Sequence, residues 1–98
     1  MSHWKNTEIR IGQIKRYNSK TVIFEANWNI PVIDNIIPSC GCTSVKYYPT
    51  LRQLKVDYKA GEIPKHISGN SQPIDKKITI VYQDGTSENL FIKGTKIR

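Results

Sequence analysis

Two cysteines separated by a single glycine, Cys40 and Cys42, have a residue type and a spacing that suit metal binding or redox chemistry. Two neighbouring thiolates can bind a soft metal ion such as copper or zinc, or act as a redox pair. A structural zinc site needs four ligands, and only His3 and His66 are present to complete one. We expect the first in a terminal arm and the second in a loop, so they do not converge. The sequence therefore predicts no metal site and no cofactor, with the two cysteines as the only metal candidates.

A structural interpretation competes with metal binding at this cysteine pair. Gly41 permits the dihedral angles of a tight turn, and two small thiols can pack inward. A disulfide across one residue would close a small, strained ring that is easily reduced. Residues 1–8 contain no apolar run, so we expect no secretory leader and folding in a reducing compartment. The sequence then predicts free thiols in a structural turn.

Catalysis by a cysteine nucleophile requires a positioned histidine and an orienting carboxylate. His66 falls in an expected loop, and no acidic residue is recognisably tied to it. The chain contains neither a phosphate-binding glycine motif nor a paired-carboxylate motif. We therefore expect no enzymatic activity and no catalytic residue.

The composition predicts the fold class of the elements that hold these residues. The chain has 98 residues, enough for one domain, and its 15 isoleucines stand against only six Ala, Leu and Met residues. Because β-branched side chains favour strands over helices, the chain is expected to be all-β. No apolar run reaches the roughly 18 residues that a membrane-spanning helix needs, so we expect no membrane span.

Alternation of apolar and polar residues predicts seven strands and one long connection, over residues 60–73. The expected strands cover residues 8–14, 21–28, 30–37, 44–48, 54–58, 78–82 and 90–93. Trp28 continues the apolar face of the second strand, which places it in the core. Seven short strands separated by turn signals are typical of an antiparallel β-sandwich of immunoglobulin type. We expect one such domain over residues 8–98, preceded by an N-terminal arm over residues 1–7.

The segment Pro38-Ser-Cys-Gly-Cys-Thr43 resembles the signature of a bacterial family of immunoglobulin-like domains of unknown function. Similar segments extend the resemblance from about Glu8 to Ile97: residues 11–14, 22–27, 31–33 and 90–94. The chain departs from the family at Tyr48-Pro-Thr-Leu51, where members usually carry a Pro-Gly-Glu turn. The resemblance implies an immunoglobulin-like fold and supplies no catalytic residue.

The net charge of +7 favours an acidic partner. The lysines are scattered rather than interleaved with aromatic residues, which disfavours nucleic acid as that partner. A small, basic immunoglobulin-like domain without a leader is similar to the auxiliary capsid (decoration) proteins of tailed bacteriophages, including crAss-like phages. This similarity implies a structural virion component that is made in the host cytoplasm and binds the major capsid protein in many copies. The alternatives are an adhesion module of the bacterial periplasm or cell surface, and a soft-metal-binding protein.

Partner contacts are expected from exposed aromatic and basic side chains. Trp4, in the polar arm, is either an interface anchor or a cap on its own sandwich. Tyr47 and Tyr48 are adjacent, so one of them faces outward if they lie in a strand. The full set of contact candidates is Trp4, Lys15, Arg16, Tyr47, Tyr48, Lys65, His66, Lys76 and Lys77.

Overall fold

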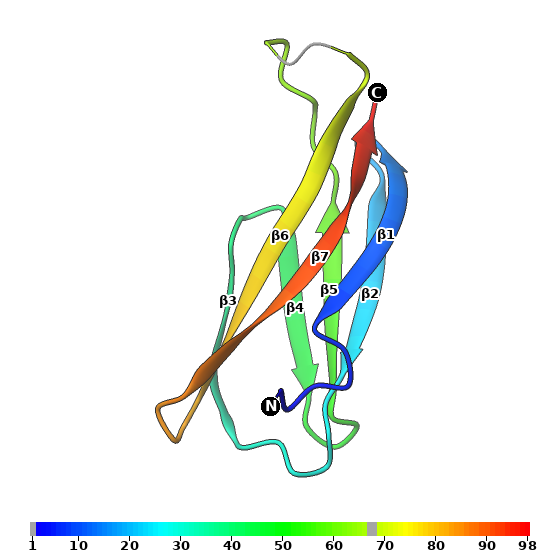
Figure 1. The fold of residues 1–98 in the computed structure, drawn as a ribbon. Coiled ribbons are helices and arrows are strands. Elements are labelled where there is room, and N and C mark those ends of the chain that lie inside the picture. Colours follow the sequence, from blue (N-terminus) through cyan, green and yellow to red (C-terminus); the bar gives the residue numbers. More distant parts are fainter. Residues whose placement is uncertain (1, 67–68) are drawn as a thin grey trace.

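A computed structural model describes residues 2–66 and 69–98, which form seven strands in two layers (Figure 1). The strands are β1 (Glu8–Lys15), β2 (Ser19–Glu25), β3 (Ile33–Pro38), β4 (Thr43–Tyr48), β5 (Gln53–Lys59), β6 (Ser71–Tyr82) and β7 (Ser87–Ile97). No helix occurs within these described ranges, and they accordingly hold no helix that is long and apolar enough to cross a membrane. The expected all-β class is confirmed.

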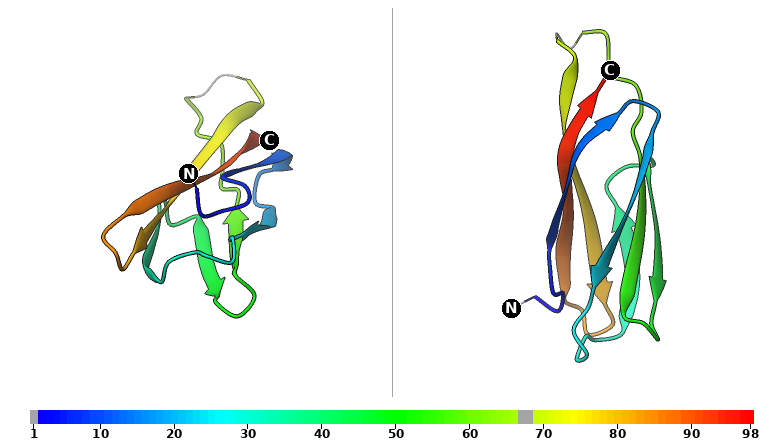
Figure 2. Two further views of the ribbon diagram at one scale, coloured as in Figure 1. Left: turned by 60° about the horizontal axis from the view of Figure 1, so that its bottom comes forward. Right: turned by 90° about the vertical axis from the view of Figure 1, so that its right-hand side faces the viewer.

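The seven strands form a four-stranded sheet, in the order β1-β7-β6-β3, and a three-stranded sheet, in the order β2-β5-β4. Figure 2 shows the two sheets packed face to face as a sandwich. All neighbouring strands are antiparallel except β1 and β7, which run parallel, so the expectation of a wholly antiparallel sandwich is wrong at this edge. Apart from β1, the strand order is that of an immunoglobulin constant-type domain. An immunoglobulin-type relationship beyond this order stays a prediction.

The core lies between the two sheets because alternate residues of each strand point inward. Phe24 of β2 and Leu54 of β5 meet Ile80 of β6 and Ile92 of β7, and all four side chains are fully buried. Burial of each such side chain contributes roughly 1.5–3 kcal/mol. A second, smaller cluster of buried side chains surrounds Ile14, near the end of β1.

The N-terminal arm continues the sandwich. Its backbone pairs with the end of β2, where the Lys5 amide donates to the Glu25 carbonyl at 2.8 Å. The Asn27 amide in turn donates to the His3 carbonyl at 2.8 Å. The chain then crosses to the other sheet, where the Phe91 amide donates to the Thr7 carbonyl at 2.8 Å. The arm therefore joins the two sheets at one end of the molecule.

A close approach between β1 and β7 depends on two glycines. The pairing register shifts between Arg10 and Gln13, and Gly12 inside this bulge has a φ of 68°. A Cβ atom added to Gly94 would lie 2.6 Å from the Gly12 carbonyl oxygen and 2.7 Å from the Ile11 side chain. Only glycine at position 94 lets the parallel strand approach this closely.

Several predicted boundaries are wrong for identifiable reasons. The second strand ends at Glu25 and the third begins at Ile33, so residues 26–32 form a connection rather than strand. The predicted connection over residues 60–73 ends before Ser71, where β6 begins. Pro73 is tolerated inside β6 because β3 pairs with β6 only from Ile78 onward, which leaves this stretch with a free side.

Candidate functional site

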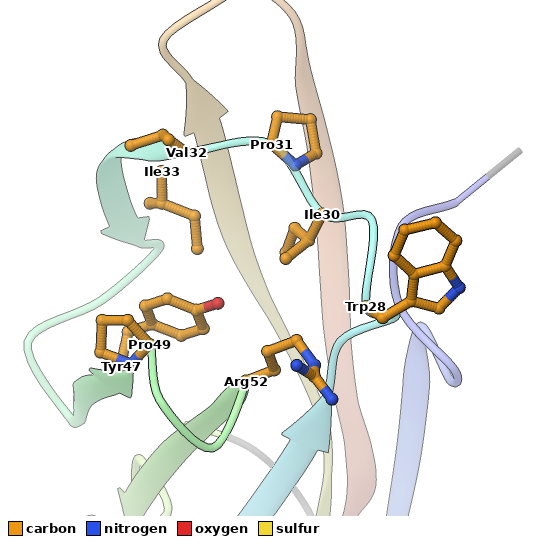
Figure 3. A pocket seen from close by; sticks show the side chains of 8 residues that line it. All are labelled: Trp28, Ile30, Pro31, Val32, Ile33, Tyr47, Pro49 and Arg52. Atoms are coloured by element: carbon orange, nitrogen blue, oxygen red, sulfur yellow. The ribbon is translucent and has the colours of Figure 1, made fainter.

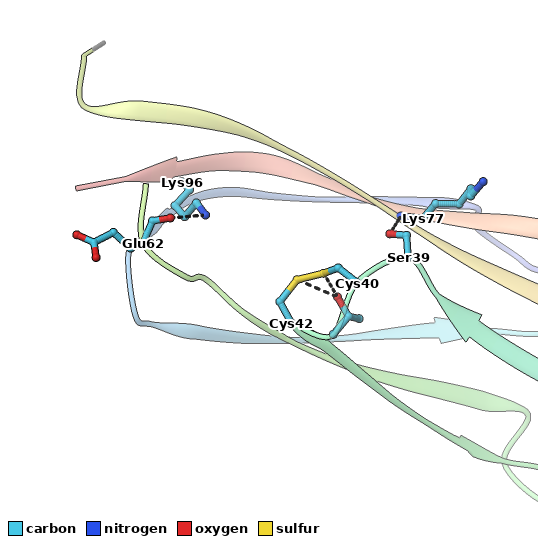
Figure 4. The surroundings of a disulfide bond; sticks show 7 residues. Ser39, Cys40, Cys42, Glu62, Lys77 and Lys96 are labelled. Atoms are coloured by element: carbon cyan, nitrogen blue, oxygen red, sulfur yellow. Dashed lines mark hydrogen bonds between the residues drawn. A yellow bond between two sulfur atoms is a disulfide. The ribbon is translucent and has the colours of Figure 1, made fainter. Parts of the chain in front are cut away.

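The cysteine pair lies in the connection that carries the chain from β3 in one sheet to β4 in the other. Cys40 and Cys42 form a disulfide, so the expectation of free thiols is wrong (Figure 4). With one residue between the cysteines, the chain-entropy model gives only about 1.6 kcal/mol of stabilisation, against about 3 kcal/mol for a loop of about 15 residues. The disulfide therefore stabilises the fold by about half as much as one that closes a loop of about 15 residues.

No metal centre forms around this pair. Within residues 2–66 and 69–98, no three His, Cys, Asp or Glu side chains gather closely enough to hold a metal ion. His3 packs edge-on against Tyr82, with ring centroids 5.3 Å apart, at the end of the sandwich where the arm crosses. His66 lies exposed in the β5–β6 connection at the opposite end (Figure 1). Both cysteine sulfurs are bonded to each other in the disulfide, so neither is available as a thiolate ligand for a metal ion.

One end of the sandwich carries an open apolar pocket of about 380 Å³. Its walls come from the β2–β3 connection and from the β4–β5 turn (Figure 3). The lining residues are Trp28, Ile30, Pro31, Val32, Ile33, Tyr47, Pro49 and Arg52. Together with Leu51, which is 62% exposed in the same turn, we call these residues the apolar end. The volume falls within the range of ligand pockets.

Trp28 is the most exposed large apolar side chain at this end, at 83%, so its prediction as a core residue is wrong. The alternating pattern continues through Ala26, but the strand does not. The Ile30 amide donates to the Asn27 carbonyl at 3.1 Å, which closes a turn with Trp28 at its first central position. The turn directs the indole to the surface instead of the core.

Arg52 brings a positive charge to the apolar end. A double turn after β4, in which the Arg52 amide donates to the Pro49 carbonyl at 3.2 Å, places Arg52 at a φ of 52°. Its guanidinium reaches toward the space between Trp28 and Ile30 (Figure 3). It forms no hydrogen bond or ion pair with the described residues. Burial raises the pKa of the neighbouring Tyr47 hydroxyl, and the Arg52 charge partly opposes that rise.

Trp4 caps its own sandwich. It is only 3% exposed, and its indole nitrogen donates to the Tyr82 hydroxyl at 2.9 Å. The Tyr82 hydroxyl donates in turn to the Glu88 carboxylate, which also accepts from the His3 amide at 3.2 Å. Burial and the hydrogen bond to Glu88 both raise the pKa of Tyr82. The interface-anchor interpretation of Trp4 is therefore wrong, because the side chain is not accessible to a partner.

The other contact candidates lie on several elements of the sandwich. Lys15 and Arg16 lie at the end of β1, where Arg16 pairs with Glu62 at 3.4 Å. Tyr47 lines the pocket of the apolar end, whereas Tyr48 lies on the outer face with the Lys46 ammonium 5.3 Å from its ring centroid. The remaining candidates are Lys65 and His66 in the β5–β6 connection and Lys76 and Lys77 in β6.

The residues that sequence reasoning missed are Val32, Leu51 and Arg52. The available signal was the placement of apolar residues inside turn sequences, next to Pro31 and Pro49, where they cannot join the alternation of a strand. Val32 and Leu51 are exposed, whereas Ile63 in the β5–β6 connection is buried, so a position in a connection does not by itself decide exposure.

The chain was compared with family models, curated proteins and solved structures, and no match was found in any of the three. The resemblance to the immunoglobulin-like family with the Cys-Gly-Cys-Thr turn therefore stays a prediction.

Proposed function

We propose that this protein is a non-enzymatic structural protein that docks on another protein through the apolar end. The observation that carries the proposal is Trp28, exposed at 83% beside an Arg52 guanidinium that has no partner among the described residues. Exposed apolar patches with a polar rim are typical of protein-binding surfaces. Trp, Tyr and Arg are also the residue types that dominate binding energies, and Trp28, Tyr47 and Arg52 all line this pocket.

The charge of the protein indicates the kind of surface that it binds. With a net charge of +7 and Arg52 at the pocket wall, an apolar side chain flanked by a carboxylate is the complementary feature of the partner. Such a contact associates faster at low salt, because opposite charges steer the encounter. We expect the association rate to fall as the ionic strength rises.

The partner that we propose is the major capsid protein of a bacteriophage, and the protein is then an auxiliary capsid or decoration protein of the virion. The resemblance to immunoglobulin-like domains and the basic charge support this assignment. A shell presents many equivalent sites, so the protein is expected to bind it in many copies. The disulfide is compatible with the outside of a particle, where oxidising conditions preserve it.

Fractionation of the native source tests this proposal. Mass spectrometry of purified particles is expected to find the protein in a stoichiometric ratio to the major capsid protein. Its absence from particles would exclude the capsid assignment.

The apolar end is tested separately, by the binding of purified protein to particles or capsid protein. We expect Trp28→Ala to weaken binding about 30-fold or more, which corresponds to about 2 kcal/mol. Ile23→Ala is the matched control, because Ile23 is also exposed, at 47%, but lies on the outer face of β2 away from the pocket. Equal losses for the two variants would refute docking through the apolar end.

The disulfide also favours a second candidate, an adhesion module of the bacterial periplasm or cell surface, since those compartments maintain disulfides as well. In that case the protein is recovered with the cell envelope and not with particles. The same fractionation therefore separates the two candidates.

A further inference from the structure

We propose that the Cys40–Cys42 disulfide is an exchange site for thiol-bearing peptides, which reach it through a pocket beside Cys42. This site lies at the opposite end of β4 and β5 from the apolar end and does not depend on the proposed docking function. The pair closes a short loop and contributes about half the stabilisation of a disulfide across about 15 residues. The pocket that gives access to the disulfide, the groups beside the sulfurs and the hydrogen bonds that hold the turn each favour exchange.

Access comes from the second pocket, which has a volume of about 390 Å³. Cys42 and Gly41 form part of its wall, opposite Tyr17, Tyr58 and Ala60, whereas Cys40 is not among the lining residues. Gly41 is exposed, and a Cβ atom added to it would meet nothing within 4 Å. Cys42 therefore lies beside this pocket, and the approach of a peptide thiolate from the pocket to the Cys42 sulfur is part of the proposal.

The direction of approach determines which sulfur leaves. Thiol–disulfide exchange proceeds by attack of a thiolate on one sulfur while the other sulfur departs. The peptide thiolate forms a new S–S bond with Cys42 as the Cys40–Cys42 bond breaks. Cys40 takes the bonding electron pair as a thiolate and is protonated by water. The thiolate of a second peptide molecule then attacks the peptide sulfur of the mixed disulfide. Cys42 leaves with the bonding electron pair as a thiolate and is protonated by water, and the two peptide sulfurs end joined in a peptide disulfide.

Thr43 is the positioning residue for this step. Its hydroxyl oxygen lies 3.8 Å from the Cys40 sulfur and 3.8 Å from the Cys42 sulfur, and the residue is only 5% exposed. A hydroxyl at this distance can donate to the sulfur that becomes negative. Stabilisation of the Cys40 thiolate lowers its pKa, and a thiol of lower pKa leaves faster.

The turn is held on both sides, so opening the disulfide does not release the strands. The Ser39 amide donates to the Lys77 carbonyl at 2.9 Å, and the Lys77 amide donates to the Ser39 hydroxyl at 3.1 Å. On the other side, the Lys59 amide donates to the Cys42 carbonyl at 3.0 Å. These bonds join the turn to β6 and β5 whatever the state of the sulfurs. The fold is therefore expected to persist in the reduced form.

The first experiment treats the whole protein with reduced glutathione and follows both thiols by alkylation and mass spectrometry. We expect complete reduction with an unchanged far-ultraviolet circular dichroism spectrum, and re-formation of the disulfide with oxidised glutathione. Reduction only after unfolding in urea would overturn the proposal. So would loss of the β-sheet spectrum on reduction.

The second experiment tests the assignment of Cys42 as the sulfur that the peptide thiolate attacks. With oxidised glutathione, Cys40→Ser leaves Cys42 to form a mixed disulfide, and Cys42→Ser leaves Cys40. With each rate divided by the thiolate fraction, taken from the pH dependence of alkylation of the same variant, we expect Cys42 to react about threefold or more faster. Equal corrected rates would refute entry through the pocket.

The role of Thr43 is tested by two substitutions. Thr43→Val is expected to slow reduction by glutathione roughly threefold, and Thr43→Ser is expected to retain the wild-type rate. In the Cys42→Ser background, Thr43→Val is also expected to raise the pKa of Cys40, read from the pH dependence of alkylation. An unchanged pKa would remove Thr43 from the mechanism.

Discussion

The two tryptophans provide a direct test of how the arm and the apolar end are built. Trp4 is 3% exposed and Trp28 is 83% exposed, although the alternation of the sequence predicts Trp28 in the core. We expect Trp4→Ala to lower the free energy of unfolding by about 3–5 kcal/mol, the usual cost of truncating a buried aromatic side chain. The truncation also removes the donor to the Tyr82 hydroxyl. Trp28→Ala is expected to change this free energy by less than about 0.5 kcal/mol.

These values are large enough to measure. A domain of this size has a total stability of about 5–15 kcal/mol, so loss of the Trp4 side chain removes a substantial fraction. With a urea dependence of about 1.5 kcal/mol per molar, a loss of about 3 kcal/mol lowers the unfolding midpoint by about 2 M. Trp4→Phe keeps most of the apolar contact and removes the indole donor. It is therefore expected to cost about 1–2 kcal/mol, the part that belongs to the hydrogen bond and the smaller ring.

The assay is urea denaturation followed by circular dichroism, with acrylamide quenching of tryptophan fluorescence as a second measurement. In the native protein only the emission of Trp28 is expected to be quenched. The reasoning fails if Trp28→Ala destabilises the protein as much as Trp4→Ala. It also fails if the Trp4→Ala variant keeps the unfolding midpoint of the wild type.

The remaining predictions concern β1, the buried tyrosine and the salt dependence of docking. Gly94→Ala is expected to lower the free energy of unfolding by about 1–3 kcal/mol, as measured by thermal or urea unfolding, because the added Cβ would lie 2.6 Å from a backbone oxygen. Gly61→Ala is the control, because nothing lies within 4 Å of the added Cβ, and it is expected to lower this free energy by less than about 0.5 kcal/mol. The raised pKa of Tyr82 means that the unfolded chain ionises first, so stability is expected to fall as the pH rises above about 10, and less steeply in Tyr82→Phe. Association with the proposed capsid partner is expected to slow with added salt, and Arg52→Gln to reduce that dependence, as measured by surface plasmon resonance.

Local patterns predict the middle of each strand well. Val22 and Phe24 alternate with exposed neighbours in the sequence, and both are buried in β2. The pattern fails where a contact between distant residues decides the outcome. Trp4 is buried because Tyr82, 78 positions away in the chain, accepts its hydrogen bond. Nothing in the local sequence of the arm indicates that partner.

The candidate site was harder to predict than the fold, because it is made of turns. Trp28 keeps the alternation of β2, and only the hydrogen bond from Ile30 to Asn27 shows that the strand has already ended. The expectation for the cysteines failed for a different reason. It rested on an expected reducing compartment, whereas the close spacing of Cys40 and Cys42 brings the sulfurs together in the turn itself.

The positions of the two sites follow from the way in which a sandwich divides its residues. Inward-facing side chains of both sheets are committed to the core, and the outer faces are largely polar, so reactive or adhesive groups are left to the connections at the ends. The apolar end and the disulfide pocket lie at opposite ends of β4 and β5, strands of six and seven residues that span about 20 Å. Sites this far apart, with no shared contacts, are expected to contribute independently. A protein docked through Trp28 therefore keeps its disulfide facing away from the partner, where thiols in the surroundings can still reach Cys42.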